Sequence, residues 1–281
     1  MKTEMRPDPE VSRIGREKYQ LQYQAVHASI AAQEIGLDGK TVLEIGGNLP
    51  AGFVFDQLKV KRWVAIQEPT YWSEIGTGVD LGGARVLPIE ECPPIERLEG
   101  YTVLLGQIEK LPTALYGSFD RIFSVAAFEH IHELGLALRM MRRALAADGA
   151  LYSMHAPIWS THDGHHLPSV TDEAGKAFSC GNVPIPPWGH LLMRPPEMFR
   201  LLQGHMDERT ASKICYYVYH SPHINRLFYE DYLSYAGVSG FRGEVAGFVC
   251  GPVPEDIQRR LELLYPGRAR FDAQGQVMIL R

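Results

Sequence analysis

Short apolar runs alternate with helix-like segments from residue 40 onward, and this alternation restricts the fold more than any other feature. Five runs of strand length precede residue 157, at 41–45, 63–66, 102–105, 121–125 and 150–154. Helical spacing of apolar residues occurs at 11–35, 53–58 and 127–146. Strands that alternate with helices favour βαβ units with right-handed crossovers. We therefore predict an α/β fold whose doubly wound, mostly parallel sheet is covered on both faces.

The regular pattern stops at Pro157 and resumes near residue 225. The intervening stretch is rich in His, Pro and Gly, and so long an irregular segment inside a compact domain is usually functional. Beyond it we expect helices at 225–235 and 255–264 and strands at 245–250 and 276–281. The prediction is one domain in four parts: an N-terminal helical segment (1–39), a cofactor-binding core (40–157), a cap insertion (158–222) and the C-terminal part of the sheet (223–281).

Composition excludes several classes of protein. Hydrophobic residues make up 45% of the chain, which is typical of a globular protein rather than a disordered one. The 28 basic and 33 acidic residues give a net charge of −5, which argues against a nucleic-acid-binding partner. The four cysteines form no CxxC pair, and no apolar run is long enough to span a membrane. We expect a cytoplasmic protein with no membrane partner, and homo-oligomerisation is left open.

The first strand ends in a glycine turn, Glu44-Ile45-Gly46-Gly47-Asn48. Glycines at the carboxyl end of a parallel strand let the backbone approach a ligand closely. A dinucleotide fingerprint would require G-x-G-x-x-G, and two of its three glycines are missing here. Because Glu44 would repel a pyrophosphate, the turn suits a cationic ligand without phosphate.

With these motifs the sequence resembles the class I S-adenosylmethionine-dependent methyltransferases. The resemblance rests on the glycine turn, on Glu68, on 106–112, on 119–131 with Phe128-Glu129-His130-Ile131, and on 145–151. It implies a Rossmann-like methyltransferase fold with seven strands and S-adenosyl-L-methionine as cofactor. By this resemblance the residues that bind the cofactor are Glu44, Gly46, Gly47, Asn48, Glu68, Gln107, Ile108 and Ser124. Among them, Glu68 would hold the ribose hydroxyls, while Gln107 stands where the family more often has Asp.

Methyl transfer is an in-line displacement, and a hydroxyl acceptor must also lose its proton, so a nearby His or carboxylate is useful. Histidines after the fifth strand lie where the acceptor site should be. We expect the general base to be one of His155, His165, His166 and His190. The expected reaction is O-methylation of a small molecule such as a sugar or a secondary metabolite, which is typical of natural-product biosynthesis.

A metal site was considered around His162, Asp163, His165 and His166. No HExxH pattern is present, and adjacent histidines on an extended chain point in opposite directions. We therefore predict no metal ligands, and a divalent ion is not favoured.

Two other functions stay open at this point. One is an NAD(P)-dependent oxidoreductase on a similar sheet, which the broken glycine fingerprint disfavours. The other is a methyltransferase-like binding protein without turnover, because Asn48 and Gln107 depart from the family pattern.

Overall fold

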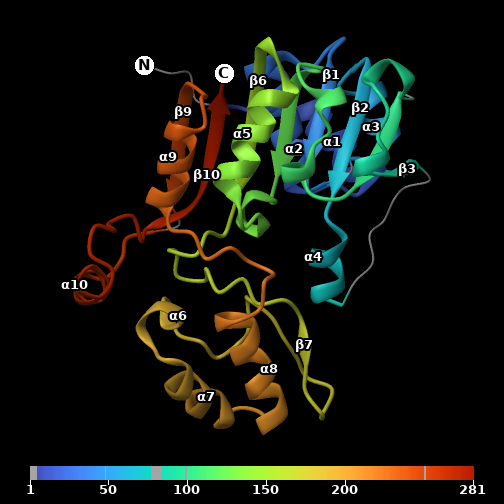
Figure 1. Ribbon diagram of the computed structural model, residues 1–281. Coiled ribbons are helices and arrows are strands. Elements are labelled where there is room, and N and C mark those ends of the chain that lie inside the picture. Colours follow the sequence, from blue (N-terminus) through green and yellow to red (C-terminus); the bar gives the residue numbers. More distant parts are fainter. Residues whose placement is uncertain (1–4, 48, 77–83, 99, 250) are drawn as a thin grey trace.

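The computed structural model describes residues 5–47, 49–76, 84–98, 100–249 and 251–281. In these ranges the main sheet has eight strands in the order β3-β4-β2-β1-β5-β6-β10-β9 (Figure 1). The strands are β1 (Thr41–Ile45), β2 (Arg62–Gln67), β3 (Arg85–Pro88), β4 (Tyr101–Leu105), β5 (Phe119–Val125), β6 (Leu145–His155), β9 (Gly243–Val249) and β10 (Ala273–Leu280). β10 is antiparallel to both of its neighbours, and the other pairs are parallel. The predicted doubly wound, mostly parallel sheet is confirmed.

The sheet has one more strand than the seven we predicted. The additional strand is β3, which pairs in parallel with β4 at the edge of the sheet. Its sequence, Arg85-Val86-Leu87-Pro88, has only two apolar residues besides the proline, and its ends are exposed. Because an edge strand of this length carries no buried alternating pattern, its sequence does not distinguish it from a loop.

Helices cover both faces of the sheet, as predicted. In Figure 1, α5 (Leu134–Ala144) and α9 (Tyr229–Val238) lie in front of the strands, with α1 (Pro9–Tyr19) and α2 (Tyr23–Ala31) behind them. The remaining helices of the core are α3 (Ala51–Asp56) and α4 (Pro69–Glu74). Short 3-10 turns occur at Ile89–Glu91, Ile95–Arg97, Ile108–Lys110, Thr113–Leu115 and Phe128–His130. Successive residues of β1 enter different cores: Val42 packs behind the sheet with the residues of α2, and Leu43 packs in front with those of α5.

The predicted helix over 11–35 is wrong as a single element. The structure has α1, α2 and then a short π-helix, Ala32–Gly36. The break is at Gln20, whose φ of +57° places it in the left-handed conformation that ends α1. Gly15 then lets α1 fold back onto α2, since a Cβ at this position would lie 2.3 Å from Cβ of Ala25.

The predicted helix over 127–146 begins late and ends early. A 3-10 turn occupies Phe128–His130, and α5 ends at Ala144. Strand β6 begins at the next residue, so Asp148 and Gly149 lie inside a strand rather than at the end of a helix. The bulge in the pairing of β5 with β6, between Phe119 and Arg121, accommodates this early start.

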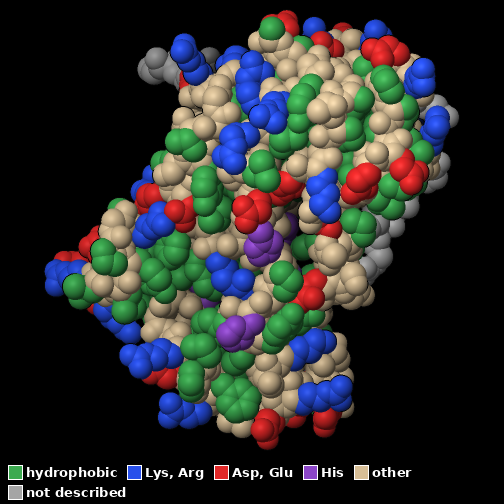
Figure 2. Space-filling model, in the orientation of Figure 1, with side chains coloured by type: hydrophobic (Ala, Val, Ile, Leu, Met, Phe, Trp, Pro, Cys, Tyr) green, Lys and Arg blue, Asp and Glu red, His purple; other side chains and the backbone are tan. Residues whose placement is uncertain are grey.

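Figure 2 shows acidic and basic side chains interspersed on the visible face of the molecule, with no broad basic surface. Of the helices in the described ranges, none combines the length and the apolar character that a membrane crossing requires.

The cap lies at the carboxyl ends of the parallel strands (Figure 1). It contains a two-stranded sheet, β7 (Val170–Thr171) with β8 (Ala177–Phe178), and three helices: α6 (Gly189–Leu192), α7 (Pro195–Gln203) and α8 (Glu208–Tyr219). The aromatic run 216–219 lies on α8, and Tyr217 and Val218 are buried in the core of the cap.

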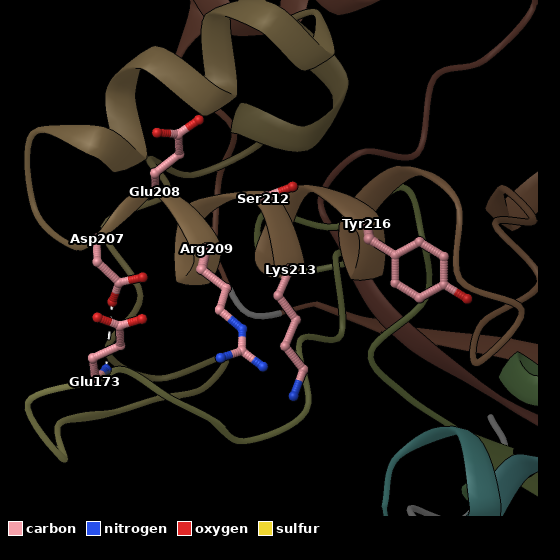
Figure 3. Close-up of a pocket in the computed structure, with 7 residues that line it drawn as sticks. All are labelled: Glu173, Asp207, Glu208, Arg209, Ser212, Lys213 and Tyr216. Atoms are coloured by element: carbon pink, nitrogen blue, oxygen red, sulfur yellow. Dashed lines mark hydrogen bonds between the residues drawn. The ribbon is translucent and has the colours of Figure 1, made fainter.

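A shallow surface pocket lies along α8 (Figure 3). Its lining consists of Glu173, Asp207, Glu208, Arg209, Ser212, Lys213 and Tyr216. None of these residues follows a strand of the main sheet, so the pocket is a feature of the outer surface of the cap rather than of the predicted cofactor site.

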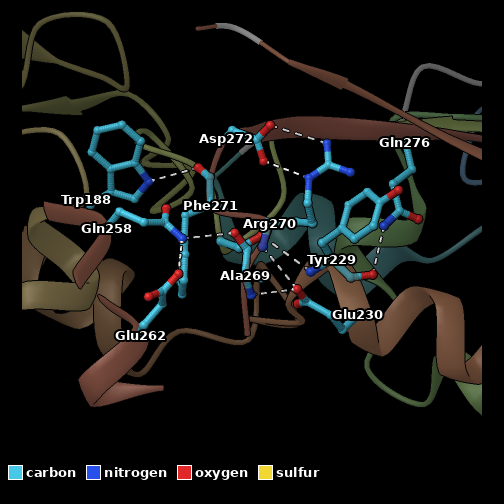
Figure 4. A network of polar contacts seen from close by, with 11 residues as sticks. Trp188, Tyr229, Glu230, Gln258, Glu262, Ala269, Arg270, Phe271, Asp272 and Gln276 are labelled. Atoms are coloured by element: carbon cyan, nitrogen blue, oxygen red, sulfur yellow. Dashed lines mark hydrogen bonds and ion pairs between the residues drawn. The ribbon is translucent and has the colours of Figure 1, made fainter. Parts of the chain in front are cut away.

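Residues after β9 also contribute to the cap. Helix α10 (Glu255–Leu264) lies beside α6 and away from the sheet, and Leu261 and Phe271 are buried in the core of the cap (Figure 1). A polar network fixes this return segment (Figure 4). In it the Trp188 indole donates to the Phe271 carbonyl at 3.1 Å, and the Ala269 and Arg270 N–H groups donate to Glu230 at 2.9 and 3.1 Å.

Candidate functional site

The turn after β1 packs directly against the loop after β5. Gly46 has a φ of +80°, which glycine adopts without strain. A Cβ on Gly46 would lie 2.2 Å from Cβ of Ala127, and a Cβ on Gly47 would lie 2.5 Å from Oε1 of Glu44. Neither position has room for a larger residue unless its neighbours move. Asn48, the next residue of the predicted site, lies outside the described residues.

Glu44 supports this turn from the interior. Its side chain is buried, and its Oε2 accepts hydrogen bonds from the Leu49 N–H at 2.9 Å and from the Trp63 indole N–H at 2.6 Å. Burial raises the pKa of Glu44 to about 7, although both hydrogen bonds oppose the shift. We expected Glu44 to contact the cofactor. In the structure, one of its oxygens instead holds the glycine turn in place through hydrogen bonds.

The raised pKa of Glu44 predicts a dependence of stability on pH. Its ordinary pKa of 4.5 applies to the unfolded chain, so its contribution to stability is complete below pH 4.5 and decreases as pH rises through about 7. We expect the free energy of unfolding of the wild type to fall, relative to that of Glu44→Gln, by up to about 3 kcal/mol between pH 4 and pH 8. Urea unfolding at the two pH values measures this difference. If the free energies of unfolding of the two proteins differ by the same amount at pH 4 and at pH 8, folding does not disfavour the ionised form of Glu44.

Glu68 follows β2 and caps α4 (Pro69–Glu74). One carboxylate oxygen, Oε1, accepts hydrogen bonds from the N–H and the hydroxyl of Thr70. The other oxygen, Oε2, is buried and has no hydrogen-bond partner in the part of the chain that the structure describes. A buried acceptor in this state normally meets a donor from a ligand or a water molecule.

The remaining cofactor candidates lie at the ends of β4 and β5. Gln107 is exposed after β4, and Ile108 is buried in the turn that follows. Ser124 is buried near the end of β5, where its hydroxyl donates to the Ile45 carbonyl at 3.0 Å. Because β4, β2, β1 and β5 are neighbours in the sheet, the described candidates all lie side by side at the carboxyl ends of these strands.

Three ligand-type side chains converge just beyond β5. Glu129, His130 and His166 each place one carboxylate oxygen or ring nitrogen within 4.8 Å of the others, and we call them the acid–imidazole cluster. Glu129 is fully buried, and neither of its oxygens has a hydrogen-bond partner among the described residues. Burial raises its pKa to about 8, although the backbone N–H groups of Glu129 and Ala156 oppose the shift. Nδ1 of His166 is also buried without a partner.

The two imidazoles of the cluster are held in place by their surroundings. Nδ1 of His130 is hydrogen-bonded to the His223 carbonyl, and Nε2 of His223 is hydrogen-bonded to the His166 carbonyl at 2.9 Å. The His130 ring lies 4.2 Å from the Tyr71 ring and 4.9 Å from the His166 ring, measured between centroids. Burial lowers the pKa of His166 to about 4 and that of His130 well below its ordinary value, so both are neutral at pH 7.

Tyrosines from two other elements lie close enough to Glu129 for its charge to affect them. Burial, followed by the charge of Glu129, raises the pKa of Tyr71 on α4 to about 12, and the same two causes raise the pKa of Tyr23 on α2. The cluster therefore lies between the N-terminal helices, the end of β5 and the cap.

Residues 74–153 match the family model described as "Methyltransferase domain". The matched segment runs from the end of α4 to β6 and includes the 3-10 turn that carries Glu129 and His130. The match agrees with the resemblance of the sequence to the class I S-adenosylmethionine-dependent methyltransferases. A methyltransferase domain of this kind supports S-adenosyl-L-methionine as the cofactor. An oxidoreductase on a similar sheet, the first of the two alternatives, has no support from this match.

The chain is also similar to solved methyltransferase structures, at low sequence identity. An S-adenosylmethionine-dependent methyltransferase from Mesorhizobium loti is 15% identical, with a TM-score of 0.43 over 88% of this chain and 92% of that chain. One from Thermotoga maritima is also 15% identical, with a TM-score of 0.41 over 96% of each chain. No curated protein is significantly similar in sequence to this methyltransferase.

Of the four histidines expected to include the base, the structure places only His166 in the acid–imidazole cluster. His155 is fully buried at the end of β6, with its ring stacked on those of Phe128 and Tyr232 at 5.5 and 4.5 Å. His165 and His190 are buried in the cap, 5.7 Å apart between ring centroids.

These three histidines share a depressed pKa. Burial lowers the pKa of His155 and of His165 to about 3 and that of His190 to about 4. The neutral ring of His190 is held through Nε2 by the Trp159 carbonyl at 2.8 Å. Burial among aromatic rings and backbone groups accounts for all three without a role in proton transfer.

The group His162, Asp163, His165 and His166, which we considered for a metal, does not converge in the structure. Nδ1 of His162 lies 3.7 Å from Asp163, whose carboxylate also accepts two hydrogen bonds from Gln274, at 3.0 and 3.2 Å. His166 has a φ of +48°, and its ring lies against that of His130 instead.

Glu129, His130 and Tyr71 were absent from the predicted site. The sequence did single out the segment Phe128-Glu129-His130-Ile131, but only as evidence for the family, and no pattern marked its carboxylate as buried. Tyr71 lies on the short helix that directly follows Glu68. Its position shortly after the end of a strand is the one sequence feature that could have indicated a place in the site.

Proposed function

We propose that this methyltransferase methylates a hydroxyl group of a small molecule, such as a sugar or a secondary metabolite. The observation that carries the proposal is the acid–imidazole cluster: a buried carboxylate without partners beside two neutral imidazoles, directly after the loop that contacts the glycine turn. An acceptor hydroxyl must lose a proton as it is methylated, and the cluster offers groups that can accept one.

The cofactor site proposed here consists of the strand-end residues named above. The buried, unpartnered Oε2 of Glu68 fits a hydrogen bond from a ribose hydroxyl, because it is the kind of acceptor that a ligand donor satisfies. Glu44, Gly46 and Gly47 would shape the backbone turn around the amino-acid end, and Gln107 and Ile108 would border the base. When bound, S-adenosylmethionine supplies a methyl group on a positively charged sulfur.

The acceptor side lies between the strand ends and the cap. Glu74, the last residue of α4, joins the two parts: its Oε1 accepts hydrogen bonds from the Tyr216 hydroxyl at 2.9 Å and from the Ser221 hydroxyl at 2.6 Å. Glu129 itself is fully buried. A small acceptor enclosed by the cap suits such a site better than the surface of a macromolecule, so we propose the cap insertion (158–222) as the acceptor-binding part of the domain.

His166 is the general base that we propose from the four original candidates. Its neutral ring has a nitrogen without a hydrogen-bond partner among the described residues, and it lies beside the carboxyl group of Glu129. This assignment describes the cluster without a bound ion.

Calorimetric titration with S-adenosylmethionine, followed by transfer of its labelled methyl group to a panel of sugars, phenols and amines, tests the proposal. We expect binding by the wild type and about 100-fold weaker binding by Glu68→Ala, because hydrogen bonds to a charged group contribute about 1.5–3 kcal/mol. Glu90→Ala, which removes an exposed carboxylate on a neighbouring turn, is the matched control and should bind like the wild type.

The panel separates the remaining alternatives. Transfer to hydroxyl compounds supports the proposal, and transfer to amines alone would contradict it. Cofactor binding without transfer to any acceptor would indicate a binding protein without turnover. Equal affinity of the wild type and Glu68→Ala would remove Glu68 from the cofactor site.

A further inference from the structure

We propose that the acid–imidazole cluster is a binding site for a divalent transition-metal ion, with Glu129, His130 and His166 as its protein ligands. The donor set is one carboxylate oxygen and two imidazole nitrogens, which are ligands that Zn²⁺, Co²⁺ and Fe²⁺ accept. Three protein ligands leave coordination positions open, as in metal sites that bind a substrate.

The distances suit a site that closes around an ion. Two atoms bound to one metal at about 2.0–2.2 Å can be separated by at most about 4.4 Å. The three candidate ligand atoms lie within 4.8 Å of one another. In tetrahedral coordination the ligand atoms would be about 3.3–3.6 Å apart, so side-chain movements of up to about 1.5 Å would bring all three into coordination distance.

Unsatisfied atoms point to a missing partner at this place. Glu129 is fully buried. Among the described residues, neither its two oxygens nor the buried Nδ1 of His166 has a hydrogen-bond partner. A buried carboxylate in this state is costly unless it is neutralised or paired with a cation. One divalent ion would satisfy atoms on both side chains at once.

The orientation of His130 is typical of a metal ligand. A ligating histidine usually donates its other ring N–H to a carbonyl or a carboxylate, which fixes the tautomer and the ring. Nδ1 of His130 meets the His223 carbonyl in this way, leaving Nε2 as the nitrogen available to the ion. His223 is itself fixed by Ser221, whose hydroxyl lies 3.1 Å from its Nδ1, so the second layer is also ordered.

The ion would change how the acceptor loses its proton. A bound divalent ion lowers the pKa of a coordinated hydroxyl group, and His166 is then a ligand rather than a base. This catalytic consequence rests on the proposed function, whereas the binding of the ion does not. An all-oxygen site would favour Mg²⁺, but the two imidazoles favour the transition metals.

Titration of the chelator-treated, full-length protein with CoCl₂ and ZnCl₂ tests the site, by calorimetry and by the visible absorption of bound Co²⁺. We expect one site per chain and binding of Mg²⁺ at least 100-fold weaker than that of Zn²⁺. Glu129→Gln and His166→Asn should each weaken Co²⁺ binding by about 30-fold or more. Asparagine is chosen at 166 because it tolerates the left-handed backbone of that residue.

His162→Asn is the matched control, since it removes a histidine from the same loop but outside the cluster, and its affinity for Co²⁺ should stay within twofold of the wild type. Absence of Zn²⁺ and Co²⁺ binding by the folded wild type would overturn the proposal, as would unchanged binding by Glu129→Gln. Calorimetry with S-adenosylmethionine on the same samples separates the two claims: cofactor binding without metal binding refutes only the metal site, and loss of cofactor binding by the wild type refutes the proposed function.

Discussion

Gly46→Ala is expected to abolish detectable binding of S-adenosylmethionine. The added Cβ would lie 2.2 Å from Cβ of Ala127, and the backbone φ of +80° disfavours any residue with a Cβ. To relieve the overlap, the turn after β1 and the loop after β5 must separate, and both border the proposed cofactor site. We expect the affinity measured by calorimetry to fall by more than 100-fold.

Gly117→Ala provides the matched control for backbone strain. Gly117 also has a positive φ, of +66°, but a Cβ there would meet no atom within 4 Å. Its variant should lose some stability and keep its affinity for the cofactor. If Gly46→Ala is folded by circular dichroism and binds as tightly as the wild type, the glycine turn does not form the cofactor site.

His166→Asn is expected to lower kcat by 100-fold or more. Loss of a general base typically costs a factor of 10²–10⁴, and loss of a metal ligand at the same position would also remove activation of the acceptor. Because the strand-end residues are untouched, the affinity for S-adenosylmethionine should remain within a few fold of the wild type. Initial rates with the best hydroxyl acceptor of the panel, combined with calorimetry, measure both quantities.

His155→Gln distinguishes a reacting histidine from a structural one. His155 was an equal candidate in the sequence, but its ring is stacked between Phe128 and Tyr232. Its variant should lower the melting temperature and retain most of kcat. A large loss of kcat in His155→Gln, with full activity in His166→Asn, would contradict the assignment of the base.

The sheet could be predicted because its strands carry their own signal. Val42, Leu43 and Ile45 are apolar and buried on both faces, and the runs in β2, β4, β5 and β6 behave in the same way. β3 lacks such a run, and no alternation of residues marked it. Likewise, no apolar spacing indicated that Gln20 would adopt a left-handed conformation and divide the N-terminal helix.

The strand-end residues of the proposed cofactor site were more predictable than those of the proposed acceptor site. Gly46, Glu68 and Ser124 occur just after or at the ends of adjacent parallel strands, so topology alone brings them to one sheet edge. The acid–imidazole cluster instead joins Glu129 to His166 across the irregular cap. No local periodicity relates such positions, and four histidines of similar sequence context were therefore indistinguishable before their burial and contacts were known.

The return segment between β9 and β10 has a consequence for engineering acceptor specificity. Leu261 and Phe271 complete the interior of the cap, yet they lie about a hundred residues after its first residues in the chain. In a chimaera that takes only 158–222 from a homologue, the side chains of the new cap would pack against the original Leu261 and Phe271. Their shapes would not be complementary, so cavities or steric overlaps would result. Recombination of this methyltransferase should therefore transplant 251–272 together with the insertion, as two segments that have adapted to each other.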